Sequence, residues 1–168
     1  TFSLGGSNVN TAAVAAMNSV GIRPQGLFDQ KSINFGGSLN SAFGRYALVG
    51  NTTGNYNTAL GNQALQANTT ASSNTAVGFQ SLYANTTGTE NTVVGTNGAG
   101  GANTTGQQNS AFGGYSFKSN TTGSYNSAFG LGSLGSATTA SNNSAFGHAS
   151  LANNTTGASN VAVGNQAL

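Results

Sequence analysis

The side chains that could carry acid–base or metal chemistry in this chain are few and lie far apart. The 168 residues contain one His, one Asp and one Glu, which are His148, Asp29 and Glu90. A metal site needs several ligands in one shell, and a nucleophilic Ser or Thr needs a neighbouring base and an orienting acid. Because the three residues occupy separate segments, the sequence predicts no metal site, no catalytic residues and no enzyme.

Composition argues against several other classes of function. Charged residues make up 4% of the chain and the net charge is +2, too little for the basic surface of a nucleic-acid-binding protein. The chain has no Cys, and none of its apolar runs approaches the roughly 20 residues that span a bilayer. The Gly-rich strings GAGG and GLGSLG lack the following Lys of a phosphate-binding loop. We expect no cofactor, no nucleic-acid partner and no membrane insertion by this segment.

The dominant feature of the sequence is a pentapeptide close to Asn-Ser/Thr-Ala-apolar-Gly that recurs at a nearly constant interval. Successive copies begin 17 residues apart, with one interval of 18 between Asn91 and Asn109. A fixed period is typical of stacked repeats, each too small to bury its own apolar face. In the other copies the counterparts of His148 are Arg45, Asn62, Phe79, Thr96, Gly114, Leu131 and Asn165. Such variety indicates a permissive surface position rather than a catalytic one.

Two apolar columns, aligned on the last Gly of each pentapeptide, predict an ordered core rather than low-complexity disorder. A 17-residue period suits two short strands and two turns, so we expect a parallel β-solenoid in which each coil pairs with the next. The second strand is expected around Ala47 and Leu48. The predicted core consists of Phe43, Leu60, Val77, Val94, Phe112, Phe129, Phe146 and Val163 before that Gly, and of Leu48, Leu65, Leu82, Phe117, Leu134, Leu151 and Leu168 after it.

Two further columns follow from the same alignment. Strand side chains alternate, so if the large column fills the interior, a column of small residues faces outward, either towards another chain or simply towards solvent. That possible inter-chain face is Ala42, Ala59, Ala76, Val93, Ala111, Ala128, Ala145 and Ala162. The opening Asn residues form either a buried amide ladder or plain turn closures. They are Asn40, Asn57, Asn74, Asn91, Asn109, Asn126, Asn143 and Asn160.

The 18-residue interval and the ends of the chain depart from the pattern. Between Gly95 and Asn109 only Ala99 fills the Leu position, so a bulged turn and the weakest coil are expected there. Residues 1–39 are predicted to form a partly helical cap or connecting segment, and residues 40–168 the solenoid. Leu168 falls halfway through a repeat, so either more protein follows or this edge receives another subunit and builds a filament.

The pentapeptide resembles the SVAIG-like motif of YadA-type head repeats in trimeric autotransporter adhesins, and similar repeats occur in bacteriophage tail fibres. The resemblance covers residues 40–168. It implies a left-handed parallel β-roll in which three chains pack about one axis, and a function in adhesion or display without catalytic machinery. We therefore expect a homotrimeric, extracellular rod on a cell or virion surface, whose receptor or matrix ligand the sequence does not name.

Other functions remain as alternatives. A head-to-tail extracellular filament is the second hypothesis, and the repeated Thr-Thr pairs raise an ice-binding solenoid as a third, although neighbouring Thr side chains in a strand point to opposite faces. The chain also carries sequences that match the glycosylation sequon, although Asn and Thr are equally typical of turns. They begin at Asn51, Asn68, Asn85, Asn103, Asn120 and Asn154.

Overall fold

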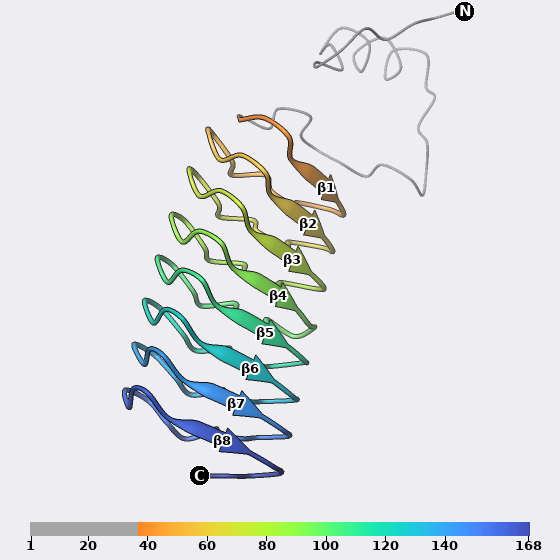
Figure 1. Cartoon of the computed structure of the whole chain (residues 1–168). Helices are drawn as coiled ribbons and strands as arrows, with labels where there is room; N and C mark the ends of the chain where they lie inside the picture. Colours follow the sequence, from red (N-terminus) through yellow and green to blue (C-terminus); the bar gives the residue numbers. More distant parts are fainter. Residues whose placement is uncertain (1–36) are drawn as a thin grey trace, which may run out of the picture.

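A computed structural model describes residues 37–168, which form an all-β rod of stacked coils (Figure 1). Each coil contributes one three-residue strand to a parallel sheet in which the strands follow chain order. The strands are β1 (Ser41–Phe43), β2 (Thr58–Leu60), β3 (Thr75–Val77), β4 (Thr92–Val94), β5 (Ser110–Phe112), β6 (Ser127–Phe129), β7 (Ser144–Phe146) and β8 (Val161–Val163). The predicted β-solenoid with 17-residue coils is confirmed. The predicted helical segment near the N-terminus lies outside the described residues.

The register places equivalent residues of successive pentapeptides directly above one another. Ala59 pairs with Ala76, and Leu60 pairs with Val77. The longer coil does not shift this register, because Val93 pairs with Ala111 on the far side of the extra residue. Each position of the pentapeptide therefore forms an unbroken column along the rod.

The second strand expected in each coil is absent from residues 37–168, and that prediction is wrong. The segment containing Leu48 and Leu65 is a turn, in which their φ angles are 54° and 50°. Left-handed backbone costs an ordinary residue about 1–2 kcal/mol and is incompatible with a strand. The coils are still bonded to each other here, since the Leu48 N–H donates to the Ala64 carbonyl at 2.9 Å. Burial of the Leu side chain, worth about 1.5–3 kcal/mol, offsets the strain.

The two faces of the strands are the reverse of the prediction. Ala59 is 1% exposed whereas Leu60 beside it is 45% exposed. The small column lies inside each coil, and the large column faces outward. The expectation that the large column fills the core is wrong for Phe43, Leu60, Val77, Val94, Phe112, Phe129, Phe146 and Val163, all of which are exposed or only half-buried. The prediction that the two columns point in opposite directions is correct.

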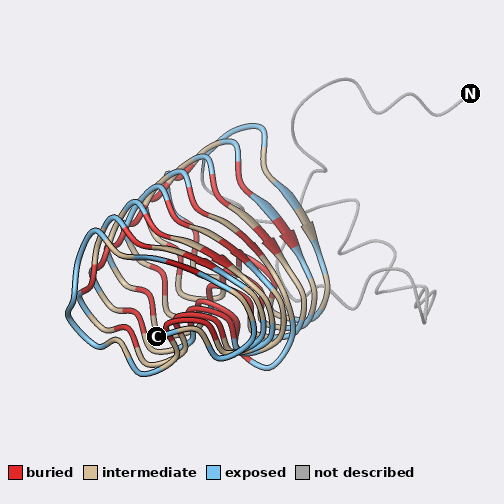
Figure 2. Cartoon of the chain, turned by 60° about the horizontal axis from the view of Figure 1, so that its bottom comes forward, coloured by how far each residue is buried: buried red, intermediate tan, exposed pale blue. Residues whose placement is uncertain are grey.

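The width of the coil explains this reversal. The leucine column, namely Leu48, Leu65, Leu82, Phe117, Leu134 and Leu151, is buried as predicted and joins the small column in one core. In Figure 2 the middle of the strands and the segments that face them are the buried parts of each coil. Because leucines already fill the interior from one side, only Ala or Val fits on the other. Leu168 was also predicted in the core, but it is 81% exposed, because none of the coils in residues 37–168 covers it.

The 18-residue coil is widened as expected, but the residue in its leucine position was misassigned. The Leu82 N–H donates to the Ala99 carbonyl, and the Gly100 N–H donates to the Ser116 carbonyl. These bonds place Gly100, and not Ala99, between Leu82 and Phe117 in the leucine column. The extra residue therefore lies between Gly95 and Ala99. This coil lacks a large side chain where every complete 17-residue coil has one.

Candidate interaction surface

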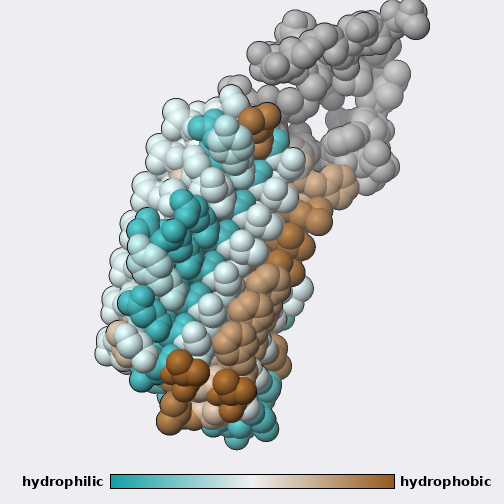
Figure 3. All heavy atoms as spheres, viewed as in Figure 1, coloured by the Kyte–Doolittle hydropathy of each residue, from teal (hydrophilic) through white to brown (hydrophobic). Residues whose placement is uncertain are grey.

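The outward face of the sheet carries a continuous row of large apolar side chains, here called the apolar column. It consists of the third residue of each strand, namely Phe43, Leu60, Val77, Val94, Phe112, Phe129, Phe146 and Val163. In Figure 3 a brown, hydrophobic stripe runs along the rod on the side where the strands end in Figure 1. The rings of Phe112 and Phe129 stack at 4.8 Å, and those of Phe129 and Phe146 at 5.1 Å.

The apolar column contrasts with the surface around it. The first residue of each strand also points outward and is Ser or Thr in every strand except β8, which begins with Val161. Monomeric soluble proteins rarely expose long contiguous apolar patches, and larger ones mark interaction sites. Stacking between coils buries part of each ring but leaves Phe112 36% and Phe146 42% exposed. The column is therefore the strongest candidate for a contact surface in the described chain.

The inter-chain face predicted from the sequence cannot serve that role. Ala42 is half-buried, and the other seven members of the small column are at most 4% exposed. Their side chains contact the leucine column of the same chain. A second chain approaching the sheet would meet the apolar column, and the assignment of Ala42, Ala59, Ala76, Val93, Ala111, Ala128, Ala145 and Ala162 to an inter-chain face is wrong.

The opening Asn residues form a hydrogen-bonded ladder, which was one of the two predicted alternatives. Asn74 is fully buried, and its Nδ2 donates to Asn57 Oδ1 at 3.3 Å and to the Gly88 carbonyl at 2.9 Å. The backbone N–H and the side-chain amide of Asn91 both donate to Asn74 Oδ1, at 3.0 and 3.2 Å. The buried Asn amides of this ladder are therefore paired, and the ladder ties each coil to its neighbours in one register.

A second Asn ladder, which the sequence reasoning missed, runs through the Asn-Thr-Thr-Gly turns. Asn68 Nδ2 donates to Asn51 Oδ1 at 2.9 Å, and Asn85 Nδ2 donates to Asn68 Oδ1 at 3.1 Å. The two ladders converge on a shared carbonyl, as where Asn57 and Asn68 donate to the Ala71 carbonyl at 2.9 and 3.0 Å. The regular recurrence of these Asn residues in the sequence could have indicated a second ladder, but it was interpreted only as a feature of the turns.

The second ladder also bears on the glycosylation sequons. The side chains of Asn51, Asn68, Asn85, Asn103 and Asn120 are at most 4% exposed, and only Asn154 is half-buried. The Nδ2 atom, to which a glycan would be attached, donates instead to a carbonyl inside each coil, as in Asn120 to Gly123 at 3.0 Å. The folded rod therefore offers no access to the buried sequons.

In the inner coils the first Thr of each Thr-Thr pair is half-buried and the second is exposed, whereas in the first and last pairs both are exposed. In every pair except the last, the first Thr donates its hydroxyl to a backbone carbonyl of the next coil, as Thr69 does to Thr86 at 3.1 Å. The second Thr, such as Thr70 or Thr87, is exposed. Where this bond forms, the hydroxyl of the first Thr closes the turn and has no hydrogen left to donate to water.

His148 and Glu90, two of the residues first considered for chemistry, form separate side-chain hydrogen bonds in the structure. His148 Nδ1 is 2.9 Å from Asn165 Oδ1 on the surface, and Glu90 Oε2 accepts a hydrogen bond from Gln108 Nε2 at 2.7 Å. Asp29 falls outside the described residues. Between residues 37 and 168 the structure holds no group of three His, Cys, Asp or Glu side chains arranged to hold a metal ion. That same stretch contains no helix long and apolar enough to cross a membrane.

Comparison with protein families, curated proteins and solved structures finds no match to this chain.

Proposed function

We propose that this chain is a non-catalytic rod module that associates with copies of itself through the apolar column, as a homotrimer, and serves in adhesion or display. The proposal rests mainly on the apolar column, which forms an apolar stripe along a rod whose surface is otherwise mostly Asn, Ser, Thr and Gly. Burying apolar surface against another chain contributes about 25 cal/mol per Å². The resemblance to YadA-type head repeats and phage tail-fibre repeats supports three chains around one axis.

The core and the ladders support a mechanical role. Ladder hydrogen bonds recur in each coil, and the pairing is parallel and in register from β1 to β8. Such a stack resists bending and slippage because shifting one coil would break all of its amide bonds together. A stiff rod that holds a tip or a lateral site away from a surface suits an extracellular location on a cell or virion. Its partner there would be a surface receptor or a matrix component.

Substitution on and off the apolar column tests this proposal. Phe129→Glu places a charge in the middle of the column, where association would bury it without a partner. Leu131→Glu is the matched control, because Leu131 is 50% exposed and lies outside the column. Light scattering after size exclusion should give a trimeric mass for the wild type and for Leu131→Glu, and a single-chain mass for Phe129→Glu. Equal masses for all three proteins would contradict the proposal.

The same experiment separates the alternative assemblies. A head-to-tail filament, built through strand edges and not through the column, would give a mass that rises with concentration and is unaffected by Phe129→Glu. An ice-binding solenoid needs regular ranks of free Thr hydroxyls, and the bonding of Thr69 and its counterparts to the backbone leaves a single exposed rank in the inner coils. Thermal hysteresis in a freezing assay would favour that alternative.

A further inference from the structure

A hollow of about 430 Å³ lies on the side of the rod at the 18-residue coil. Phe79, Gln80 and Tyr83 of the preceding coil form one wall, and Lys118 of the following coil forms the other. The floor between them is formed by the 18-residue coil itself, mainly by Gly98 and Gly101. The volume falls within the range of about 300–1,000 Å³ that is typical of small-molecule sites.

The hollow exists because the 18-residue coil has glycines where its neighbours have large side chains. The Ala84 N–H donates to the Gly101 carbonyl, and the Ala102 N–H donates to the Lys118 carbonyl. Gly101 therefore stands in the column that holds Tyr83 above and Lys118 below. Gly98 has a φ of 73°, and a Cβ placed on it would meet no atom within 4 Å. The space beside Gly98 is therefore open, because no side chain of the widened turn enters it.

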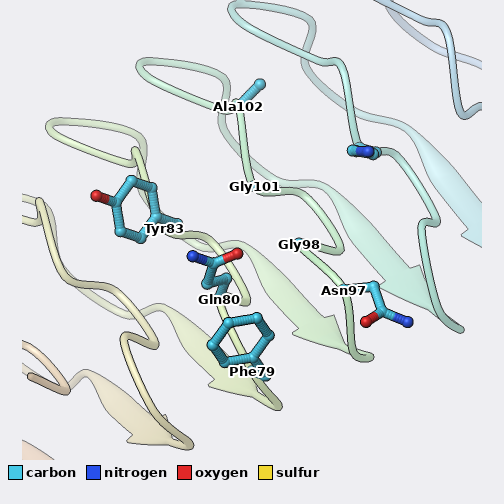
Figure 4. Close-up of a pocket in the computed structure, with 8 residues that line it drawn as sticks. Phe79, Gln80, Tyr83, Asn97, Gly98, Gly101 and Ala102 are labelled. Atoms are coloured by element: carbon cyan, nitrogen blue, oxygen red, sulfur yellow. The ribbon is translucent and has the colours of Figure 1, made fainter. Parts of the chain in front are cut away.

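The chemistry of the walls matches a sugar ring. Phe79 is 45% exposed and Tyr83 36% exposed, and Figure 4 shows Gln80 between their two rings. An aromatic face offers an apolar surface with a negative quadrupole, to which the C–H groups on one face of a pyranose are complementary. The amides of Gln80 and Asn97 lie at the hollow and can donate to or accept from sugar hydroxyls. One Nε2 hydrogen of Gln80 is already donated to Gln63 Oε1 at 3.0 Å, which leaves its other hydrogen and its Oε1. Apolar walls with a few polar groups are typical of small-ligand sites.

The charge of the hollow selects among sugars. Lys118 lies at its edge, with Nζ 5.0 Å from the centre of the Tyr115 ring. Glu90 is the only Asp or Glu between residues 37 and 168; it accepts a hydrogen bond from Gln108 and does not line the hollow. The Lys118 ammonium is thus available to a carboxylate from outside the chain.

We propose that this hollow is a binding site for an acidic saccharide, with one sugar ring against Phe79 and Tyr83 and its carboxylate near Lys118. The inference rests on the proposed adhesive function and names the class of ligand that such a rod would hold. The site uses no residue of the apolar column, so association between chains through that column and binding in the hollow can fail independently.

Titration of the full chain by isothermal calorimetry tests the site with two probes of equal length. A hyaluronan tetrasaccharide carries glucuronate carboxylates, whereas a tetrasaccharide of N-acetylglucosamine is neutral. We expect the acidic probe to bind more tightly. Tyr83→Ala should weaken its binding by about tenfold through loss of the aromatic contact. Lys118→Gln should weaken it by a similar factor and remove the preference over the neutral probe.

Matched controls make the result specific. Tyr125→Ala removes another exposed Tyr, and Arg45→Gln removes another exposed cation, both away from the hollow. Each should change the affinity less than twofold, and light scattering should give all variants the wild-type mass, showing that they fold and assemble alike. The proposal is overturned if neither probe binds at millimolar concentration, if both bind equally, or if Tyr83→Ala and Tyr125→Ala bind as the wild type does.

Discussion

Val93 occupies the space that Gly100 leaves empty in the 18-residue coil. A Cβ placed on Gly100 would lie 3.3 Å from Val93 Cγ2 and 3.3 Å from Leu82 Cδ2. Val93 is the only Val in a column that is otherwise Ala, and Gly100 is the only Gly in a column that is otherwise Leu or Phe. The coil with the missing core side chain therefore carries an enlarged one directly opposite it.

This packing predicts that substitutions at Val93 and Gly100 have coupled effects on the free energy of unfolding. Val93→Ala should lower the free energy of unfolding by about 2 kcal/mol because it leaves a cavity beside Gly100. Gly100→Leu alone should also destabilise, since the new side chain would collide with Val93. The double substitution restores the Ala and Leu pattern of the neighbouring coils, so its cost should be well below the sum of the two. Denaturant unfolding of the four proteins measures the coupling, and additive costs would contradict this packing.

The buried Asn ladder should be sensitive to the loss of one amide. Asn74→Ala removes the donors to Asn57 and Gly88. It also leaves the backbone N–H of Asn91 without its acceptor and takes one of two acceptors from the Asn91 side-chain amide. Buried groups left unpaired cost about 1–3 kcal/mol, so this variant should lose at least about 2 kcal/mol of stability. Asn62→Ala, at an exposed position, serves as the control and should change stability by less than about 0.5 kcal/mol. Equal midpoints of urea unfolding would argue against the ladder.

The second ladder has one gap, which suggests a stabilising substitution. Ala137 is buried at the position that Asn120 and Asn154 hold in the adjacent coils. Ala137→Asn would reach Asn120 Oδ1 on one side and the Ala140 carbonyl on the other, as Asn103 does with Asn85 and Gly106. We expect a gain of about 0.5–1.5 kcal/mol, visible as a higher melting temperature. A lower melting temperature would show that this coil is too tight for the amide.

Because the sequons are buried, we predict little glycosylation when the chain is expressed in a host that glycosylates proteins. Five of the six sequon Asn side chains are buried and bonded within the coils, so the folded rod should remain unmodified except at Asn154. Intact mass spectrometry should give 16.5 kDa or that mass plus a single glycan. Several glycans per chain would mean that the turns open or are modified before they fold.

The sequence predicted the coil length and the parallel stacking, because both follow from the period. It left the opening Asn residues as either a ladder or turn closures, because the period does not show whether their side chains are buried. It did not predict which face of the strand is inside. Alternation shows that Ala59 and Leu60 point in opposite directions, but both are apolar, so the pattern fits either choice. The deciding factor is the width of the coil, set by Leu65 and its counterparts in a left-handed turn that hydrophobic periodicity cannot distinguish from a strand. For the same reason the sequence placed Ala99 in the leucine position of the 18-residue coil, where the structure places Gly100.

Cysteine cross-linking at adjacent positions tests most directly whether chains meet at the apolar column. The chain has no Cys, so single substitutions can be introduced without competing thiols. Val77 belongs to the column, whereas Ala76 beside it is fully buried inside the coil. Under mild oxidation Val77→Cys should form an inter-chain disulfide on a non-reducing gel, and Ala76→Cys should not. Cross-linking of Ala76→Cys, or of neither variant, would contradict association through this face.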